Sequence, residues 1–329
     1  MWMVWGRTPP SMTGNWRFIE CTLGISAGEM PHAAITDLLG LLPSCSKPHE
    51  VTRDPSGYSW ECSRRSEERP YQSPEIITQQ DIQMTMEGRY RYITVERQGS
   101  DGIYVITLRK PPENRLDVAC CQELIRAYHS IQQLLGLDSE GAVILRGQDA
   151  KFFCTGLDLD ERERNIFSSS DGFYPLLATV LDFPFPTIAL ITGHVFGGAC
   201  LLTLAHDYRV MNANRGFWQM PPVNAGLHHD GMGSLVRSKL APKVARKVLL
   251  EAHKYTGKTA LEDGIVDSVA DPDKMFGVAL ELAEKWKGKA KMGVYGLLRN
   301  ELWGQALTAY RQNSYVHHKE TAREPKVKL

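Results

Sequence analysis

Residues 187–208 read Thr-Ile-Ala-Leu-Ile-Thr-Gly-His-Val-Phe-Gly-Gly-Ala-Cys-Leu-Leu-Thr-Leu-Ala-His-Asp-Tyr, and this stretch decides the fold of the chain. Its first part, residues 187–192, is an apolar and β-branched run that is short enough for a buried strand. Its later part, residues 200–205, is an apolar run that predicts a helix. Between the two runs lie three glycines, Gly193, Gly197 and Gly198. The pattern therefore predicts a strand that turns through glycines into a helix.

Such a turn has a definite chemistry. It leaves backbone N–H groups unpaired at the positive end of the helix. A glycine there lets a ligand oxygen approach the main chain closely, because it has no Cβ atom. The turn therefore suits an anion, or an oxygen that becomes an anion during a reaction. It is not a P-loop, since no Lys-Ser or Lys-Thr follows the glycines. A tight packing turn explains the glycines equally well, so both interpretations stay open at this point.

A second stretch has a related pattern. Residues 142–147, Ala-Val-Ile-Leu-Arg-Gly, predict another buried strand, and Phe-Phe-Cys-Thr-Gly-Leu-Asp-Leu follows at residues 152–159. The motif Phe-x-x-Gly-x-Asp-Leu and the later Pro-Thr-Ile-Ala-x-x-x-Gly-x-x-x-Gly-Gly together resemble the crotonase (enoyl-CoA hydratase/isomerase) superfamily. Its monofunctional Δ3,Δ2-enoyl-CoA isomerases are the most similar members. The resemblance spans residues 90–290 and includes Asn114-Arg115-Leu116, His206-Asp207-Tyr208, Ala225-Gly226-Leu227 and residues 256–267.

Composition and charge narrow the class of protein. The chain has 329 residues and a formal net charge of +0, which gives no argument for nucleic acid or a membrane surface as a partner. No apolar run is long enough to span a bilayer, so we expect no integral membrane contact. No spacing of His, Cys and carboxylates suggests a metal site. We expect reduced, mostly buried thiols at the 7 cysteines, which are Cys21, Cys45, Cys62, Cys120, Cys121, Cys154 and Cys200.

The chain divides into three parts. Residues 1–85, with scattered Pro, Ser, Gly and Arg, do not predict a domain. We expect a disordered extension or a start site set too far upstream; a mitochondrial targeting peptide is the alternative. Residues 86–290 would form a crotonase core, and residues 291–329 a C-terminal helix and tail.

Local patterns predict the elements of the core. Residues 92–98 and 103–108 predict a hairpin, and Asp117 is placed to cap the helix that follows it. Ser-Ser-Ser-Asp-Gly at residues 168–172 predicts a break after a short helix. Thr259 and Glu262 fit a capping box. Further predictions are strands at residues 208–211 and 265–266, a loop at 217–230, and helices at 234–240, 243–252, 271–286 and 292–309.

This alternation of strands and helices predicts an α/β domain in which helices cover parallel sheets. The resemblance implies a more specific architecture. It implies repeated ββα turns that form a spiral, with C-terminal helices that pack on a neighbouring subunit. We therefore expect a homotrimer or a dimer of trimers.

The resemblance also implies the chemistry. Members of the superfamily stabilise the enolate of an acyl-CoA thioester, so coenzyme A is part of the substrate and no separate cofactor is expected. By motif position, the donors to the thioester oxygen would be the backbone N–H groups of Leu157 and Gly198, in the turns that contain Gly156 and Gly197. Removing one such donor in other enzymes costs roughly 3–4 kcal/mol of transition-state stabilisation.

The proton-transfer groups depart from the superfamily pattern. Hydratases place one glutamate in the helix after Gly-Gly and a second four residues before the glycine of the Ala-Gly-Leu motif. The chain has Leu201 and Pro222 at these positions, and neither can move a proton. A hydratase needs one group to activate water and another to protonate carbon, so hydration is disfavoured. An isomerase needs a single base, which must then lie elsewhere.

Asp230 is our candidate for this base. It stands four residues after Gly226, where the dienoyl-CoA isomerases have a catalytic aspartate. A carboxylate beside an apolar acyl pocket would have a raised pKa, which suits a general base. The competing interpretation is a cap for the helix that begins near Gly231. Asn224, Gln219, His228 and His229 could also line the pocket, although packing or surface roles are expected for the two histidines.

Binding of coenzyme A needs cations for its phosphates. Arg115 matches a position that contacts the CoA part in the superfamily, and Lys151 precedes the first glycine turn. Weaker candidates for the 3′-phosphate are Lys285, Lys287, Lys289, Lys291 and Arg299.

The last four residues, Lys326-Val327-Lys328-Leu329, resemble the Ser-Lys-Leu peroxisomal address. We therefore expect a peroxisomal protein, with a mitochondrial or cytoplasmic location as the alternative. The sequence as a whole predicts a Δ3,Δ2-enoyl-CoA isomerase of fatty-acid β-oxidation. The alternatives are an enoyl-CoA hydratase, a dienoyl-CoA isomerase, and a homologue that binds acyl-CoA without turning it over.

Overall fold

The computed structural model describes residues 52–54, 57–59, 90–99, 102–136 and 138–312. The chain falls into two units, Met1–Glu75 and Ile76–Leu329. In the first unit, strands β1 (Thr52–Asp54) and β2 (Gly57–Ser59) pair antiparallel. The rest of the predicted extension and the C-terminal Lys-Val-Lys-Leu lie outside the described residues.

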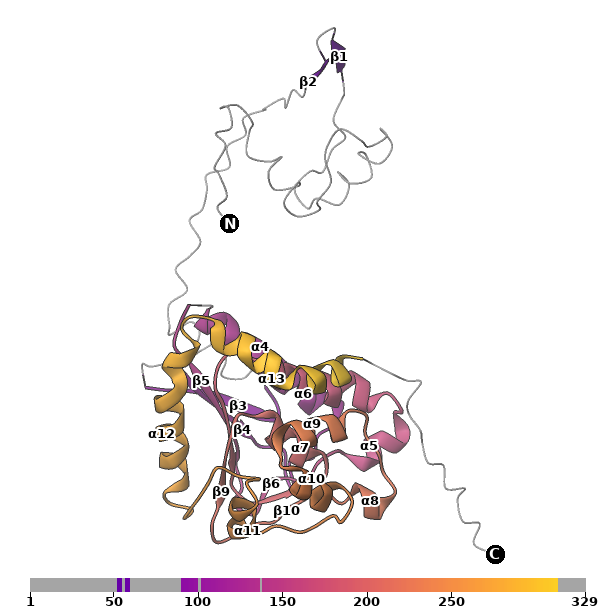
Figure 1. Ribbon diagram of the computed structural model, residues 1–329, viewed down its shortest axis with the longest axis vertical. Helices are drawn as coiled ribbons and strands as arrows, with labels where there is room; N and C mark the ends of the chain where they lie inside the picture. Colours follow the sequence, from indigo (N-terminus) through magenta and orange to yellow (C-terminus); the bar gives the residue numbers. More distant parts are fainter. Residues whose placement is uncertain (1–51, 55–56, 60–89, 100–101, 137, 313–329) are drawn as a thin grey trace, which may run out of the picture. The chain divides into compact units, whose positions relative to one another are not determined.

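A six-stranded sheet forms the centre of the second unit, in the order β11-β9-β7-β5-β4-β3 (Figure 1). Only the β3–β4 pair is antiparallel, which confirms the predicted hairpin. The other neighbours run parallel, as the sequence predicted. The strands are β3 (Ile93–Gln98), β4 (Ile103–Leu108), β5 (Ala142–Gly147), β7 (Thr187–Ile191), β9 (Tyr208–Asn212) and β11 (Ser268–Ala270).

A smaller parallel sheet has the order β10-β8-β6, with β6 at Phe152–Cys154, β8 at His194–Phe196 and β10 at Trp218–Gln219. Each of its strands follows a strand of the large sheet along the chain: β6 follows β5, β8 follows β7, and β10 follows β9. One or more helices then lead to the next large strand. This repetition is the ββα spiral that the sequence predicted.

Helices cover both faces of the large sheet. Helix α4 begins after Asp117, whose carboxylate accepts the Cys120 amide at 2.8 Å, so the predicted cap is confirmed. The helices are α4 (Val118–Leu135), α5 (Leu159–Arg164), α6 (Tyr174–Asp182), α7 (Gly198–Ala205), α8 (Pro222–Ala225), α9 (Met232–Lys239), α10 (Pro242–Leu249), α11 (Gly257–Glu262), α12 (Met275–Lys287) and α13 (Val294–Arg311).

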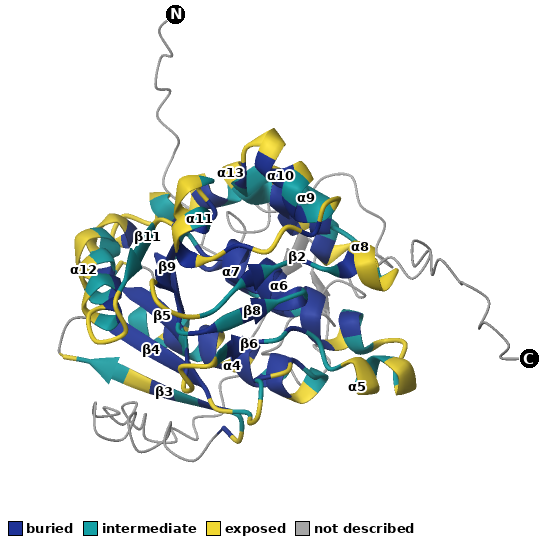
Figure 2. Ribbon diagram, turned by 90° about the horizontal axis from the view of Figure 1, so that it is seen from below, coloured by how far each residue is buried: buried dark blue, intermediate teal, exposed yellow. Residues whose placement is uncertain are grey.

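The apolar side chains form a core on each side of the large sheet. Along β4, Ile103 and Val105 face α12, whereas Tyr104 and Ile106 belong to the other core. Figure 1 shows α12 beside one face of the sheet and α4, α6 and α13 across the other. In Figure 2 the central strands are correspondingly dark blue. Burial on both faces explains why these strands appear as continuous apolar runs in the sequence.

Four cysteines, Cys120, Cys121, Cys154 and Cys200, are free and buried, as expected.

The predicted break at residues 168–172 is wrong. Ser169–Phe173 is a π-helical turn that continues directly into α6. Ser169 is 3% exposed, and a Cβ atom on Gly172 would lie 3.0 Å from the Cα atom of Val118. Close packing against α4 therefore holds a segment whose composition alone disfavours a helix. The predicted loop at residues 217–230 similarly contains β10 and α8.

Two predictions near α11 also need correction. The capping box uses Thr256 and Thr259: the Thr259 hydroxyl accepts the Thr256 amide at 3.0 Å, and the Thr256 hydroxyl accepts the Thr259 amide at 3.3 Å. A threonine thus takes the place of the usual glutamate. Residues 265–266 are not a strand, because the amides of Ile265 and Val266 donate to the Ala260 carbonyl at the end of α11. The strand begins at Ser268, where pairing with β9 starts.

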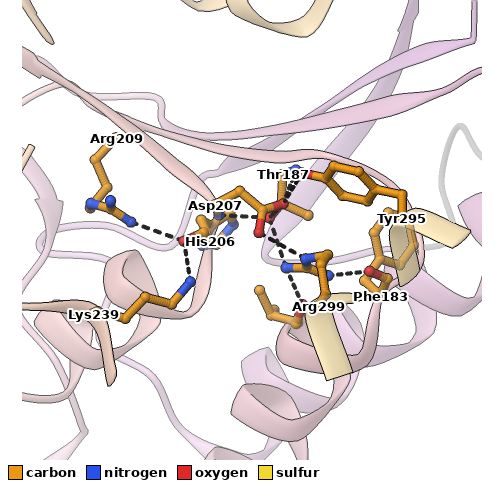
Figure 3. A network of polar contacts seen from close by, with 9 residues as sticks. Phe183, Thr187, His206, Asp207, Arg209, Lys239, Tyr295 and Arg299 are labelled. Carbon is orange, nitrogen blue, oxygen red and sulfur yellow. Dashed lines mark hydrogen bonds and ion pairs between the residues drawn. The ribbon is translucent and has the colours of Figure 1, made fainter. Parts of the chain in front are cut away.

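A buried ion pair joins α13 to the sheet (Figure 3). The Asp207 carboxylate, just before β9, accepts from the Arg299 guanidinium at 2.7 Å, the Thr187 amide at 3.0 Å and the Tyr295 hydroxyl at 3.1 Å. Arg299 also donates to the carbonyls of Phe183 and Val180 at the end of α6. Arg299 is therefore unable to meet a CoA phosphate, and that prediction is wrong.

The charges of this cluster are fixed by its surroundings. Burial alone would raise the pKa of Asp207, but the adjacent Arg299 holds it below its usual value. Burial lowers the pKa of the neighbouring His206 to about 3. Since the Leu202 carbonyl can only accept, His206 donates to it from Nδ1 at 2.8 Å, and its Nε2 accepts from the Tyr128 hydroxyl at 2.9 Å. His206 is thus a neutral imidazole with both nitrogens bonded.

We predict that Arg299→Met lowers the free energy of unfolding by about 3–5 kcal/mol, because Asp207 is left charged and buried. The matched control is Arg311→Met on the same helix. Arg311 pairs with Asp182, but the two side chains are 56% and 38% exposed, against 4% and 9% for Arg299 and Asp207. Its loss should cost less than about 1 kcal/mol. Denaturant unfolding measures both, and equal effects would contradict the prediction.

We predict that stability falls as the pH decreases from about 6.5 toward 4. In this range the unfolded chain binds a proton at residue 206, whereas the folded protein, with a His206 pKa of about 3, does not. The loss attributable to His206 is at most about 1.4 kcal/mol per pH unit. Unfolding free energies across this range should show a shallower slope for His206→Gln. The exposed His129 serves as control, since His129→Gln should retain the wild-type slope. Identical slopes for wild type and His206→Gln would refute the assignment.

Candidate active site

The two glycine turns predicted from the sequence meet in space. Gly156 follows β6 with φ +93°, and a Cβ atom on it would lie 2.7 Å from the Phe196 carbonyl oxygen and 2.9 Å from the Gly198 nitrogen. Only glycine permits both this backbone conformation and this approach. The first turn therefore lies directly against the N-terminus of α7.

Each turn contributes one unpaired amide. Leu116 and Leu157 form a parallel β-bridge. The Leu116 amide donates to the Gly156 carbonyl at 2.8 Å, and the Leu116 carbonyl accepts a hydrogen bond from the Asp158 amide at 3.0 Å. The Leu157 amide therefore points away from Leu116. Gly198 is the first residue of α7, where amides have no partner within the helix. The preceding Gly197 amide donates to the Gln219 carbonyl at 3.1 Å. Within the described residues, neither the Leu157 nor the Gly198 amide donates a hydrogen bond.

Phe173 packs against the second of these turns. A Cβ atom on Gly198 would lie 3.1 Å from the Phe173 ring and 3.3 Å from the Leu157 side chain. Phe173 is 1% exposed, so Gly198 lies beside a buried apolar ring. Two amides in such surroundings can hold an oxygen atom that gains negative charge.

Asp230 lies on the turn between α8 and α9, with its side chain 19% exposed. Its amide donates to the Tyr174 hydroxyl at 3.1 Å, and the His228 Nδ1 atom is 4.0 Å from its carboxylate. The N-cap position of α9 is Gly231, one residue after Asp230. Since Phe173 and Tyr174 are consecutive, one helical segment contacts both the paired amides and the Asp230 turn.

The two positions that carry glutamates in hydratases are confirmed as apolar. Leu201 is 0% exposed inside α7, and Pro222 is buried at the start of α8. Neither side chain has an ionisable group, so neither residue can activate a water molecule.

The structure also places the other predicted site residues. Arg115 precedes the Leu116 bridge and pairs with Glu113 at 2.9 Å, a hydrogen bond that raises the pKa of Arg115. Lys151 is exposed just before β6, with its ammonium 4.9 Å from the centre of the Phe152 ring. Asn224 is exposed on α8, and the Gln219 amide group donates to the Ala252 carbonyl.

The two adjacent histidines differ in burial, as expected. His228 is 54% exposed, whereas His229 is 4% exposed and meets the Phe173 ring edge-to-face at 6.0 Å. The sequence-based prediction missed Phe173 and Tyr174. Their available signal was Tyr-Pro followed by the apolar run Leu-Leu-Ala-Thr-Val-Leu, which is typical of a helix start.

The described part of the chain contains no helix long and apolar enough to cross a membrane. Nor do the described residues bring three or more His, Cys, Asp or Glu side chains together as metal ligands.

Comparisons with known proteins agree with this architecture. Over residues 98–325 the sequence matches the enoyl-CoA hydratase/isomerase family. The fold is also that of a probable enoyl-CoA hydratase from Mycobacterium tuberculosis, with a TM-score of 0.61 and 24% sequence identity over 67% of this chain and 92% of that one. A ββα spiral with paired turn amides defines the class as a crotonase-fold protein. The chain belongs to the enoyl-CoA hydratase/isomerase family.

Among curated relatives, the chain is 31% identical over 224 residues to the peroxisomal enoyl-CoA delta isomerase 2 of Arabidopsis thaliana, covering 64% of this chain and 91% of that protein. It is 29% identical over 200 residues to a carnitinyl-CoA dehydratase of Citrobacter koseri, covering 59% and 75%. The resemblance to enoyl-CoA isomerases that the sequence motifs indicated is thus confirmed.

Proposed function

We propose that this protein is a Δ3,Δ2-enoyl-CoA isomerase that acts on unsaturated fatty acyl-CoA in β-oxidation. The observation that carries the proposal is the pair of unpaired amides at Leu157 and Gly198, which lie side by side near a buried apolar ring. A thioester oxygen bound between them would accept two hydrogen bonds that strengthen as the enolate forms.

Asp230 is the proposed base. Its carboxylate would remove a proton from C2 of a 3-enoyl-CoA, which leaves a dienolate with its charge on the thioester oxygen. The same proton would then return to C4, so that the double bond moves to C2 and the base is regenerated. One carboxylate suffices for this shuttle.

The buried Leu201 and Pro222 support isomerisation over hydration. Hydration needs water activation and protonation of carbon by separate groups, and both usual positions are apolar here. The dehydratase relatives make hydration the first alternative to test. The second alternative is binding of acyl-CoA without turnover.

Coenzyme A would enter as part of the substrate, with no separate cofactor. Arg115 is proposed as a contact for its phosphates because the next residue, Leu116, pairs with Leu157 beside the amide pair. Lys151 is proposed as a second cation, since its ammonium is exposed.

Two relatives are peroxisomal enoyl-CoA delta isomerases, and with Lys326-Val327-Lys328-Leu329 they support a peroxisomal location.

We further propose that α13 packs on a second copy of the chain in a homotrimer or a dimer of trimers. One side of α13 packs on α6 and α9. The other side exposes apolar residues at helical spacing, which a monomer would leave in water. They are Val294 (50% exposed), Leu297 (66%), Leu298 (53%) and Leu302 (64%).

The assay that tests the reaction compares wild type, Asp230→Asn and Asp273→Asn, the same substitution at an exposed aspartate just before α12, which should keep wild-type activity. We expect the wild type to convert 3-enoyl-CoA to 2-enoyl-CoA, and Asp230→Asn to lower kcat by about 10²–10⁴-fold. Calorimetric binding of a saturated acyl-CoA should be unchanged. Full activity in Asp230→Asn would exclude this base. Binding without turnover by the wild type would establish the binding-protein alternative, and 3-hydroxyacyl-CoA as product would establish a hydratase.

The assembly is tested by Leu298→Glu combined with Leu302→Glu. Charges on the exposed side of α13 should reduce the molar mass measured by light scattering from the oligomer to the monomer. The control is Leu250→Glu. Leu250 is 69% exposed at the C-terminal end of α10, so this variant should remain oligomeric. A monomeric wild type, or an oligomer that survives both substitutions, would contradict the proposal.

A further inference from the structure

The segment that joins the two halves of the site contains a tyrosine with a specific contact. Tyr174 is the first residue of α6, is 5% exposed, and accepts the Asp230 amide on its hydroxyl oxygen at 3.1 Å. We propose that Tyr174 is a positioning residue for Asp230: its hydroxyl holds the turn that carries this carboxylate in register with the amides of Leu157 and Gly198. This inference rests on the proposed isomerase function.

The polar contacts of Tyr174 account for its burial. Ser169, five residues earlier and 3% exposed, is a second polar side chain near the same hydroxyl. Burial raises the pKa of Tyr174, so its hydroxyl stays neutral and adds no charge beside the Asp230 carboxylate. A neutral phenol can therefore fix the Asp230 backbone without competing for the proton that the carboxylate moves.

The geometry of the π-helical turn gives this contact its importance. π-helical turns are rare and often occur at functional sites. Here the turn ends at Phe173, whose ring packs against Gly198, and the next residue bonds the Asp230 turn. Phe173 and Tyr174 are adjacent in one helical segment. The backbone of this segment therefore helps to set the distance between the amide pair and the proposed base.

The turn that carries Asp230 is bounded by two glycines. It runs between Gly226 at φ +66° and Gly231 at φ +78°, both in the left-handed region. A Cβ atom on Gly231 would lie 2.9 Å from the ring of Tyr310 on α13. Packing by α13 and the Tyr174 hydrogen bond thus both restrain the turn.

Tyr310 provides a matched control. Its ring lies 5.9 Å from that of Tyr174 at an angle of 31°, and it is 1% exposed. Its hydroxyl has no hydrogen-bond partner among the described residues. Tyr174→Phe and Tyr310→Phe therefore each remove one hydroxyl from the same buried pair of rings, but only the first removes a bond to Asp230.

The experiment measures kcat and KM for 3-enoyl-CoA isomerisation, together with hydrogen exchange at the Asp230 amide. We expect Tyr174→Phe to lower kcat by about 10–100-fold, since a misplacement of about 1 Å can cost 10²-fold, and to leave KM within about twofold. The Asp230 amide should exchange faster. Tyr310→Phe should leave kcat, KM and this exchange rate at wild-type values, and circular dichroism should confirm that both variants are folded.

The outcomes separate this inference from the proposed function. An active wild type with unchanged kcat in Tyr174→Phe overturns the positioning role alone, as does an equal loss of kcat in Tyr310→Phe. A rise in KM with unchanged kcat also overturns it, because the hydroxyl would then act on substrate binding. A wild type that binds acyl-CoA without turnover removes the proposed function and, with it, the role of Tyr174 in catalysis.

Discussion

The Asp207–Arg299 ion pair is the interaction on which the arrangement of the C-terminal half depends. It lies at the junction of β7, β9, α6 and α13, and every one of these elements supplies or approaches a bonding partner. Burying two charges is costly, and the multiple hydrogen bonds around them offset that cost. With Arg299 fixed, α13 is held against α6, and Tyr310 at its far end packs on Gly231 beside the Asp230 turn. Helix α13 thus contacts both the ion pair and the turn that carries Asp230.

The paired amides follow from the repetition of ββα units. Because β6 and β8 are parallel neighbours in the small sheet, the turns that follow them emerge at the same edge. Each turn needs glycine for close approach, so Gly156 lies against the Gly198 nitrogen. A single strand-to-helix turn could supply one donor. The spiral supplies two donors at a separation set by the spacing of neighbouring strands.

The part of the candidate site that contains Asp230 is built differently. Leu201 and Pro222 continue the apolar core, so the helix after Gly198 contributes only its amide. Asp230 lies instead on a turn between two left-handed glycines, and a turn of this kind takes its position from what packs on it. Tyr174 and Tyr310 provide that packing from α6 and α13. The amides of Leu157 and Gly198 thus lie in turns that follow sheet strands, whereas the position of Asp230 depends on tertiary contacts.

The sequence by itself determined strands β3, β4, β5, β7 and β9, the glycine turns and the absence of both glutamates, since periodicity, turn residues and motif order are local properties. Residues 142–147 and 187–192 could thus be placed, and Leu157 and Gly198 named. It did not determine that residues 168–173 stay helical, because their serines disfavour a helix until Gly172 packs on α4. Nor did it show that Arg299 is buried or that Tyr174 bonds Asp230. Those contacts join residues 56 or more positions apart, and only the tertiary structure brings such residues together.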